Sequence, residues 1–508
     1  MSLAIIYTRA SIGIQAPQIN VEVHISNGLP GFVLVGLPEA TVKESKDRVR
    51  SAIINSGFTF PTKKITVNLS PADLPKEGSR FDLPIAIAIL AATEQIPNDN
   101  LAKYEFLGEL ALSGEIKAVK GAIPAAISSK KNNRTLIISI ENQSEISLIH
   151  HNNTLITHNL LELCQYLYNE INLPSVQYRE YKDDDDQLLV NLQDIIGQEH
   201  AKRALEIAAA GGHNLLLIGP PGTGKTMLAT RLTSLLPPLS DDEALESAAI
   251  TSLVSTNGSI QNWRIRPFRA PHHSASIAAL VGGGSIPKPG EISLAHNGVL
   301  FLDELPEFNR KVLDALREPI ESGEIVISRA NAKVKFPAKF QLIAAMNPSP
   351  TGHYQGTHNR TTPQQIIRYL NRLSGPFLDR FDISIEVPLL PKGTLSQKVT
   401  MTESTNKVKR RVIDARKIQI KRNKKLNSQL LPKEIQIHCL LTDEDNDYLE
   451  QALIKLGLSA RAWHRILKVS RTIADLDCSK NIERKHISEA LSYRSMDRLL
   501  IQMHKNIG

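Results

Sequence analysis

Short β-type runs dominate the first third of the chain. Residues 21–26 (VEVHIS) and 64–69 (KITVNL) alternate apolar and polar side chains with the two-residue period of a half-buried strand, and residues 32–37 (FVLVGL) form a further apolar run. Helical segments lie between and after these runs. Because strands and helices are interspersed, the pattern predicts an α+β domain over residues 1–172.

Two segments of this first region have helical character. Residues 40–57 repeat their apolar side chains every three or four positions, with Gly57 as the expected end of the helix. Residues 83–92 (LPIAIAILAA) are apolar all round, which predicts a helix buried inside the domain. The residues expected on the buried face of the first helix are Val42, Val49, Ala52 and Ile53.

A strongly acidic segment separates this region from the rest of the chain. Four successive aspartates, Asp183–Asp186, repel one another and resist packing, so residues 173–190 are expected to form a linker. From residue 191 to 391, strand-like runs alternate with helical segments, as in a parallel α/β sheet. Residues 392–508 are mostly helical in pattern. The 508 residues are therefore expected to form three domains.

A glycine-rich loop follows a buried strand at the start of the α/β region. Residues 214–219 (NLLLIG) are strand-like, residues 219–226 read GPPGTGKT, and residues 227–236 continue as a helix. This order predicts a P-loop that binds ATP. Glycines let backbone N–H groups face phosphate oxygens, lysine adds a charge at the β- and γ-phosphates, and threonine offers a hydroxyl to Mg²⁺. The expected binding residues are Gly219, Pro220, Pro221, Gly222, Thr223, Gly224, Lys225 and Thr226.

Two further strand ends carry polar groups suited to hydrolysis of ATP. Residues 298–304 (GVLFLDE) predict a buried strand ending in Asp303, which would hold Mg²⁺ through water, and Glu304, which would polarise the attacking water. Residues 340–348 (FQLIAAMNP) predict another buried strand, and the Asn347 amide at its end is suited to orienting the same water.

Three other segments are candidates for the rest of the site. Arg380, within residues 374–388, is a candidate arginine finger that would neutralise charge on the γ-phosphate, with a structural salt bridge as an equally weighted alternative. Arg461 near the start of an amphipathic helix is a candidate second arginine at the phosphates. Residues 194–212 are expected to wrap the adenine edge, and those nearest the base are Ile196, Gly197 and Gln198.

Charge is distributed unevenly. The chain has a net charge of +8, yet residues 392–508 alone have a net charge of +11 and the remainder −3. Lys and Arg release counterions from phosphate backbones, so this region suggests a polyanionic partner, although a solvated basic helix face gives the same pattern. Residues 407–427 contain ten basic residues and one acidic residue. Candidate contacts to DNA phosphates in this segment are Lys421, Arg422, Lys424 and Lys425.

The cysteines and the hydropathy of the chain indicate its expected cellular compartment. The three cysteines, Cys164, Cys439 and Cys478, are far apart in the chain, which suits a reducing cytoplasm and offers no disulfide or zinc framework. No apolar run is long enough to span a bilayer, and the first residues lack the features of a signal peptide. A cytoplasmic protein is therefore expected.

With these residues in place, the chain resembles the YifB/ComM group of magnesium-chelatase-like AAA+ proteins. The resemblance rests on the P-loop together with VEVHISNGLPGFVLVGLPEATVKESKDRVRSAI, LPKEGSRFDLPIAIAIL, RPFRAPHHSAS, AAMNP and RYLNRLSGPFLDRFD, and it covers nearly the whole chain. It implies a P-loop AAA+ core with a helical C-terminal lid, ATP and Mg²⁺ as cofactors, and a homo-hexameric ring. Relatives supply the matching arginine in trans, which favours Arg380 as a finger.

The resemblance also assigns two insertions in the core. Residues 263–298 look like the helix-2 insert of this clade, and residues 323–340 look like the pre-sensor 1 β-hairpin. Related rings direct such hairpins into the central pore, so Arg329 and Lys333 near the tip become candidate phosphate contacts. The apolar alternation that also predicts this hairpin consists of Ile325, Ile327, Val334 and Phe336.

The N-terminal region resembles the proteolytic domain of Lon proteases along residues 74–83 and 107–126. In this alignment Arg80 and Ile123 stand where Lon has its nucleophilic serine and its lysine. A Ser–Lys dyad needs a hydroxyl and a neutral amine in contact, which arginine and isoleucine do not supply. The dyad is therefore expected to be absent, with the domain serving ring assembly or DNA handling.

Four histidines raise the question of a metal site. His272 and His273 are adjacent in a loop, where such pairs are most often structural, with pore lining or metal binding as alternatives. Many relatives have a cysteine cluster after the segment of Asn347, but residues 346–370 contain none. His353 and His358 without thiolates make a poor structural zinc site, so no zinc is expected.

These properties make an ATP-driven DNA motor the leading interpretation. The resemblance implies a helicase that promotes branch migration of recombination junctions in both directions during integration of transforming DNA. Its expected partners are single-stranded and branched DNA, with recombination proteins as further candidates. Two alternatives stay open, namely a motor subunit of magnesium chelatase and an ATP-dependent Lon-type protease, which the residues at positions 80 and 123 disfavour.

Overall fold

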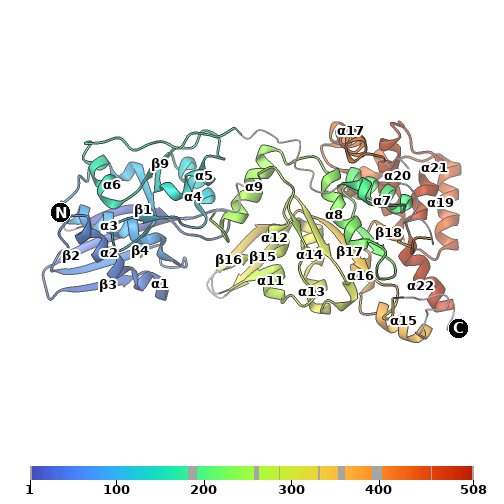
Figure 1. The fold of residues 1–508 in the computed structure, drawn as a ribbon, viewed down its shortest axis with the longest axis horizontal. Helices are drawn as coiled ribbons and strands as arrows, with labels where there is room; N and C mark the ends of the chain where they lie inside the picture. Colours follow the sequence, from blue (N-terminus) through green and yellow to red (C-terminus); the bar gives the residue numbers. More distant parts are fainter. Residues whose placement is uncertain are drawn as a thin grey trace.

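The structure is a computed structural model in which three parts follow one another along the long axis of the molecule (Figure 1). An α+β domain carries the N-terminus, a parallel α/β domain lies in the middle, and a helical domain carries the C-terminus. In the described segments, no helix combines the length and the apolarity that a bilayer-spanning helix needs. The structure describes residues 3–180, 191–256, 263–284, 287–329, 332–352, 361–391, 403–458 and 460–505.

A seven-stranded sheet organises the N-terminal domain, in the order β3-β4-β2-β1-β5-β8-β9. The pairs β1–β2 and β2–β4 are antiparallel, and the other neighbours are parallel. The three strands predicted in this region are confirmed. The strands are β1 (Leu3–Arg9), β2 (Gln18–Ser26), β3 (Gly31–Val35), β4 (Lys64–Ser70), β5 (Tyr104–Leu107), β8 (Thr135–Ser139) and β9 (Thr154–Thr157).

The predicted buried helix is α3 (Asp82–Ala92), in which every residue is buried against β1 and β2. Residues 40–57 form two helices, α1 (Ala40–Lys43) and α2 (Ser45–Asn55), rather than the single predicted one. Glu44 between them keeps helical dihedrals (φ −69°, ψ −16°), so the interruption is local. The face predicted to be buried is buried at Val42, Val49, Ala52 and Ile53.

The end of the N-terminal domain extends into the predicted linker. The Val176 N–H donates to the Thr154 carbonyl (3.0 Å), and the Arg179 N–H donates to the Ser147 carbonyl (2.9 Å). Residues 173–179 therefore pack on the N-terminal domain, because their backbone groups find partners along β9 and the helix before it. The acidic run Asp183–Asp186 lies outside the described residues.

A five-stranded parallel sheet forms the middle domain, in the order β11-β14-β17-β10-β18. Its central strands are buried at every position, as expected for a parallel sheet covered on both faces. The predicted parallel α/β architecture is confirmed. The elements are β10 (Leu215–Ile218), β11 (Phe268–Arg269), β14 (Val299–Leu302), β17 (Gln341–Met346) and β18 (Ile383–Glu386), flanked by α7 (Glu199–Gly211) and α8 (Lys225–Leu235).

Both predicted insertions contain secondary structure of their own. The segment 263–298 begins with β11, which belongs to the core sheet, and then forms α11 (Ile277–Val281) and α12 (Glu291–Leu294). The hairpin consists of β15 (Glu324–Arg329) and β16 (Ala332–Pro337), which pair antiparallel. Its buried face is the predicted set of Ile325, Ile327, Val334 and Phe336.

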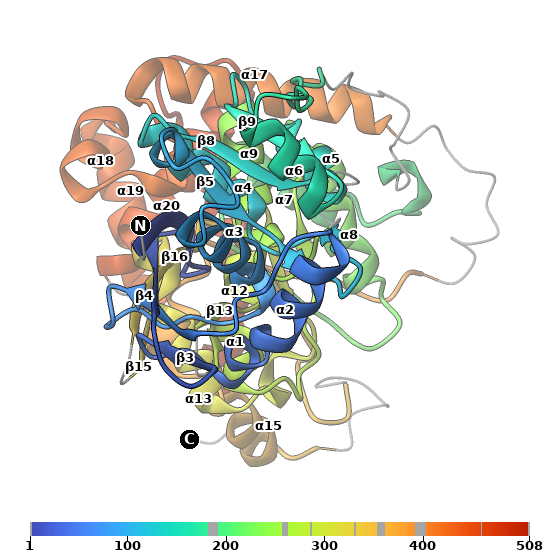
Figure 2. The same cartoon turned by 90° about the vertical axis from the view of Figure 1, so that its left-hand side faces the viewer.

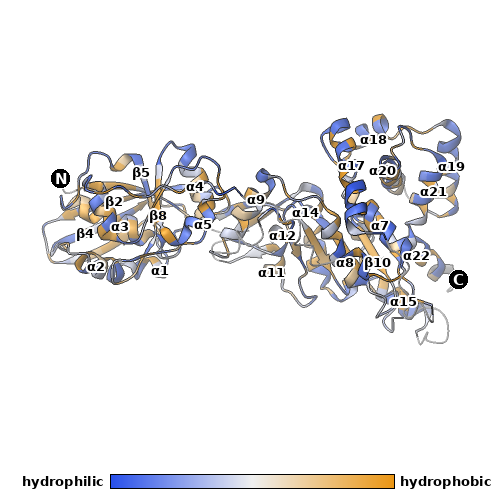
Figure 3. Cartoon of the chain, turned by 45° about the horizontal axis from the view of Figure 1, so that its top comes forward, coloured by the Kyte–Doolittle hydropathy of each residue, from blue (hydrophilic) through white to orange (hydrophobic). Residues whose placement is uncertain are grey.

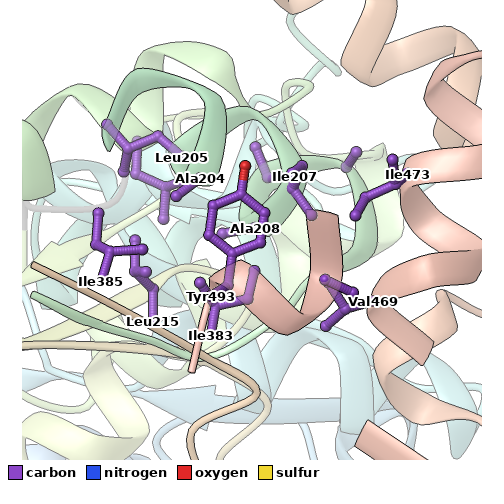
Figure 4. Packing of buried hydrophobic residues seen from close by; sticks show 14 of the residues in the cluster. Ala204, Leu205, Ile207, Ala208, Leu215, Ile383, Ile385, Val469, Ile473 and Tyr493 are labelled. Atoms are coloured by element: carbon purple, nitrogen blue, oxygen red, sulfur yellow. The ribbon is translucent and has the colours of Figure 1, made fainter. Parts of the chain in front are cut away.

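The helical domain packs against α7 and β18. Figure 3 shows hydrophobic residues concentrated on the strands and on the inward faces of the helices. Tyr493, next to α21, is fully buried among Ala208 of α7, Ile383 of β18 and Val469 of α20 (Figure 4). The helices are α17 (Thr405–Asn423), α18 (Pro432–His438), α19 (Asp443–Lys455), α20 (Ala460–Leu476), α21 (Arg484–Ser492) and α22 (Ser495–Lys505).

The N-terminal domain rests directly on the middle domain, in front of it in the view of Figure 2. A shared cluster joins Val119 and Ile123 of the first domain to Trp263 and to α9 (Asp241–Ser252) of the second. The Gly121 N–H donates to the Ser252 carbonyl at 2.7 Å. The apolar contact makes the two domains one packed unit at this boundary.

Replacing Tyr493 by alanine is expected to lower the free energy of unfolding of the middle and helical domains by about 3–5 kcal/mol, because it leaves a cavity between α7, α20 and β18. Tyr493→Phe keeps the ring and removes only the hydroxyl bond to Glu489 (2.9 Å), so it should cost about 1 kcal/mol. Urea-induced unfolding measures both values. An equal decrease in the free energy of unfolding in Tyr493→Ala and Tyr493→Phe would contradict the stabilising role of the buried ring.

Candidate nucleotide site

The predicted phosphate-binding and hydrolytic groups meet at one edge of the parallel sheet. The P-loop follows β10, Asp303 and Glu304 follow β14, and Asn347 follows β17. The register pairs Ile218 with Met346, so these strands end at the same level. The carboxyl edge of a parallel sheet is where ligands bind in α/β folds.

The P-loop has the backbone shape that its glycines allow. Gly222 and Gly224 have φ values of +78° and +85°, and a Cβ at either would meet no atom within 4 Å. Glycine is therefore needed at these two positions for its left-handed backbone conformation and not for lack of space. Gly219 differs, since a Cβ there would collide with the Val387 carbonyl oxygen. The Thr223 hydroxyl donates to the Pro220 carbonyl (2.9 Å) and closes the loop.

Lys225 begins α8 and is folded back onto the loop. Its Nζ donates to the carbonyls of Gly219 (2.8 Å) and Pro220 (2.8 Å) and to Asn347 Oδ1 (3.2 Å). Burial lowers the pKa of Lys225, and the nearby Asp303 and Glu304 carboxylates oppose that shift. The ammonium is therefore held at the head of the helix, where β- and γ-phosphate oxygens can take over as acceptors.

Thr226 and Asp303 form the part of the site that fits Mg²⁺. The Thr226 hydroxyl donates to Asp303 Oδ2 at 2.7 Å. Hydroxyl and carboxylate oxygens are the hard ligands that Mg²⁺ takes, usually with waters and phosphate oxygens completing its shell. These two residues would hold the ion, which supplies positive charge to the phosphates when bound.

Glu304 has a partner that the sequence analysis did not assign to it. Its carboxylate Oε2 lies 3.1 Å from Nδ1 of His273, and its backbone is left-handed (φ +51°). The neighbouring His272 instead contacts the Ser274 hydroxyl through its own Nδ1 (2.7 Å). No group of three or more His, Cys, Asp or Glu side chains suited to a metal occurs in the described segments, and His353 and His358 lie outside them.

The segment expected at the adenine lies beside the P-loop. Gln198 Nε2 donates to the Pro388 carbonyl (2.7 Å), and the adjacent Val387 carbonyl borders Gly219. Gly197 and Gln198 both have left-handed backbones, with φ values of +66° and +56°. These two residues turn the chain between Ile196 and α7.

Arg380 lies at the opposite edge of the sheet from these groups. It precedes β18, and its carbonyl accepts from Asn214 Nδ2 (2.9 Å) at the amino end of β10. The side chain forms an ion pair with Glu321 of α14 (Arg317–Ser322). Arg380 is therefore separated from the P-loop of its own chain by the length of β10, about 13 Å.

Arg461 also lies away from the P-loop of its own chain. It is 73% exposed, and its guanidinium is 3.6 Å from the carboxylate of Asp379, the residue before Arg380. Arg465, one turn further along α20, binds the same carboxylate at 2.8 Å. The structure thus places both candidate arginines at one edge of the sheet, apart from Lys225.

The candidate DNA contacts separate into exposed and internally paired residues. Lys333 on β16 is exposed, whereas the side chain of Arg329 lies outside the described residues. Lys421 and Lys424, at the end of α17, are exposed. The two that are paired within the helical domain are Arg422, with Asp475 (2.7 Å), and Lys425, with Glu434 (2.6 Å).

The positions aligned with the Lon dyad are buried. The Arg80 guanidinium donates to the carbonyls of Arg9 (3.3 Å) and Lys120, and its burial lowers the Arg80 pKa to about 10. Ile123 is fully buried in the apolar cluster between domains. The Ser79 hydroxyl donates to a Glu109 carboxylate oxygen. Arg80 therefore links the end of β1 to the loop before α4 (Ala122–Lys131).

Three family profiles match successive parts of the chain. Residues 191–395 match the family described as magnesium chelatase, subunit ChlI. Residues 21–142 match subunit ChlI of Mg-chelatase, and residues 402–494 match magnesium chelatase, subunit ChlI C-terminal. The three matches correspond to the three structural parts.

Individual relatives match the whole length. The chain is 62% identical over 503 residues to the competence protein ComM of Haemophilus influenzae, covering 98% of this chain and 99% of ComM. It is 61% identical to the uncharacterized protein YifB of Escherichia coli, covering 99% of each chain. The 38 kDa magnesium-chelatase subunit of Cereibacter sphaeroides is 27% identical over 217 residues, covering 38% of this chain and 57% of that subunit.

Replacing Glu304 by glutamine should abolish activation of water while the P-loop still binds ATP. We expect kcat for phosphate release to fall about 10²- to 10⁴-fold, with nucleotide affinity retained, because Lys225, Thr226 and Asp303 are unchanged. Phosphate release and binding of a fluorescent ATP analogue measure the two quantities. The matched control is Glu307→Gln, whose carboxylate pairs with Arg372 on the surface and should leave kcat unaltered.

Proposed function

The chain belongs to the YifB/ComM family of magnesium-chelatase-like AAA+ ATPases, and on this premise we propose that it is a ring-forming, ATP-driven DNA motor. The observation that carries the proposal is the division of the hydrolytic machinery between two edges of one sheet. Lys225, Asp303, Glu304 and Asn347 occupy the carboxyl edge, and Arg380 the amino edge.

This division supports an active site shared between subunits. The length of β10 separates Arg380 from its own P-loop, so it serves a phosphate only on a neighbouring chain. Head-to-tail contacts that close produce a ring, and the family resemblance favours six subunits. Arg461 shares the edge with Arg380 through Asp379, which supports a role at the same neighbouring nucleotide.

The partner that we propose is branched DNA. The hairpin exposes Lys333, and the end of α17 exposes Lys421 and Lys424, so positive charge is presented on two separate parts of the subunit. Phosphate contacts hold a strand without reading its bases, as a motor on arbitrary sequence needs. The 62% identical relative is named a competence protein, which supports branch migration during integration of transforming DNA.

A chelatase motor and a protease are the competing functions. The chelatase subunit compared above is 27% identical over 38% of this chain, whereas ComM is 62% identical over 98% of it. For a protease, Arg80 occupies the aligned nucleophile position and is tied to two backbone carbonyls. Both observations favour the DNA motor.

Mixing two inactive variants tests the shared site. Arg380→Ala and Lys225→Ala rings should each lose about 10³-fold in kcat for ATP hydrolysis. In mixed rings, an intact P-loop on one subunit meets an intact arginine on its neighbour, so up to about a quarter of the sites should recover. The control mixes Lys225→Ala with the double variant, which has no intact P-loop. Mixed rings as inactive as their components would contradict action in trans.

A labelled four-way junction tests the DNA motor. With ATP the protein should convert the junction into duplex products, and Lys225→Ala should bind the junction without converting it. Lys421→Gln combined with Lys424→Gln should reduce the slope of log affinity against log salt concentration by about two, one for each phosphate that a lysine no longer neutralises. Lys485→Gln, an exposed lysine paired with Asp477, is the matched control.

No conversion of the junction by the parent protein would overturn the motor function. ATP hydrolysis that responds only to a porphyrin-binding partner would support the chelatase instead. An unchanged salt dependence in the double lysine variant would remove α17 from the DNA interface.

A further inference from the structure

We propose that His213 is a positioning residue for Arg380, so that its loss slows ATP hydrolysis on the neighbouring subunit rather than on its own. This inference rests on the proposed function, in which Arg380 acts in trans. The contact that carries it joins His213 Nδ1 to Asp382 Oδ2 at 3.1 Å. Asp382 lies two residues after Arg380, in the segment that leads into β18.

The His213 ring and the Asp382 carboxylate are enclosed together. The His213 side chain is fully buried, and the Asp382 side chain is 14% exposed. Burial alone would raise the pKa of the Asp382 carboxyl, but its bond to His213 and nearby positive charges lower it. Because an ionised carboxylate only accepts hydrogen bonds, Nδ1 of His213 donates to it. A charge-assisted bond of this kind is stronger than a bond between neutral groups.

The residue after His213 binds the same segment. Asn214 Nδ2 donates to the Arg380 carbonyl (2.9 Å). The Asn214 carbonyl accepts from the N–H groups of Asp382 and Ile383, both at 3.1 Å. His213 and Asn214 therefore hold this segment through its side chain and through its backbone. These bonds fix the point from which the Arg380 side chain extends.

Close packing sets the position of the His213 ring. A Cβ on Gly211, the last residue of α7, would lie 2.2 Å from His213 Nε2 and 2.6 Å from the Thr472 hydroxyl oxygen. Glycine is therefore needed at position 211 to leave space for the ring. The His213 N–H donates to the Ala208 carbonyl (3.1 Å), and the His213 carbonyl accepts from Gln341 Nε2 (2.7 Å). The ring is thus fixed by α7 and the core sheet, independently of the segment that it holds.

The second ring nitrogen of His213 has a different partner. Its Nε2 lies 2.7 Å from the hydroxyl of Thr472, which belongs to α20 of the helical domain. This contact joins the helical domain to the core and by itself serves only stability. The two nitrogens therefore separate two roles, since Nδ1 faces the segment of Arg380 and Nε2 faces the helical domain.

His213 lies at the far end of β10 from the P-loop of its own chain. Asn214 and β10 follow it, and Gly219 begins the P-loop after that strand. The strand is about 13 Å long, which is too far for the imidazole to reach a phosphate bound at the loop. The effect of His213 on hydrolysis therefore passes through Arg380 and, in the proposed ring, to the nucleotide of the neighbouring subunit.

Two substitutions separate the two nitrogens. Nδ2 of asparagine is as many bonds from the backbone as Nδ1 of histidine, whereas the amide nitrogen of glutamine corresponds to Nε2. His213→Asn should keep the donor to Asp382 and the parent kcat for ATP hydrolysis. His213→Gln should lose that donor, and its kcat should fall about 10- to 100-fold because Arg380 is displaced from the γ-phosphate. Both should bind a fluorescent ATP analogue with the parent affinity.

Thr472→Val is the matched control for the other nitrogen. It removes the hydroxyl that faces Nε2 and keeps the shape of the side chain. It should lower the urea midpoint of unfolding and leave kcat near the parent value. Asp382→Ala removes the acceptor of Nδ1 from the opposite side and should reproduce the fall in kcat of His213→Gln.

Mixed rings locate the defect. His213→Gln has an intact P-loop but a displaced Arg380, so up to about a quarter of the sites should recover the parent rate when it is mixed with Lys225→Ala. Mixed with Arg380→Ala, it should show no recovery, because neither subunit supplies a positioned arginine. Asp382→Ala should behave in the same way in both mixtures.

Three results would overturn the positioning role alone. One is recovery of His213→Gln with Arg380→Ala but not with Lys225→Ala, which would place the defect in the P-loop of its own chain. Another is an equal kcat in His213→Asn and His213→Gln. The third is loss of ATP-analogue binding in both His213→Gln and Asp382→Ala. If Arg380→Ala and Lys225→Ala do not restore each other, the shared site itself is wrong, and the positioning role in trans is wrong with it.

Discussion

The parallel pairing of β10, with β17 on one side and β18 on the other, is the constraint on which the site depends. Its hydrogen bonds align Ile218 with Met346 and with Glu386, so the P-loop and Asn347 emerge side by side. The same pairing sends the chain before β18 to the far edge, where Arg380 lies. The parallel pairing of β10 therefore brings the candidate phosphate-binding groups together at one edge of the sheet and places Arg380 at the opposite edge.

In the structure, the side chains of the candidate nucleotide site contact other protein groups, and a bound nucleotide would replace these contacts. Lys225 is bonded to two loop carbonyls and Asn347, Thr226 to Asp303, and Glu304 contacts His273. A buried ammonium without acceptors would be costly, so the loop carbonyls stabilise the charge until phosphates arrive. Arg380 has an equivalent contact with Glu321. Each group that we propose to act on ATP thus already has a partner.

Packing between domains connects this site to the rest of the molecule. The helical domain joins the sheet through the cluster around Tyr493, and the N-terminal domain joins it through Trp263 and α9. A Cβ on Gly13 of the N-terminal domain would lie 2.7 Å from Val334 of the hairpin. The N-terminal domain, the insert and the hairpin are therefore close neighbours in the structure.

The sequence by itself determined the elements whose signal is local. The P-loop, the buried strands ending at Asp303 and Asn347, and the hairpin with alternating Ile325 and Ile327 follow from short apolar runs with fixed polar ends. Only the tertiary structure decided which side chains meet across the sheet. β11 has two residues, too few to show a period, so nothing local placed His273 beside Glu304. Arg422 and Asp475 are 53 residues apart in the sequence, and they pair because α17 packs against α20. No local sequence pattern encodes that contact.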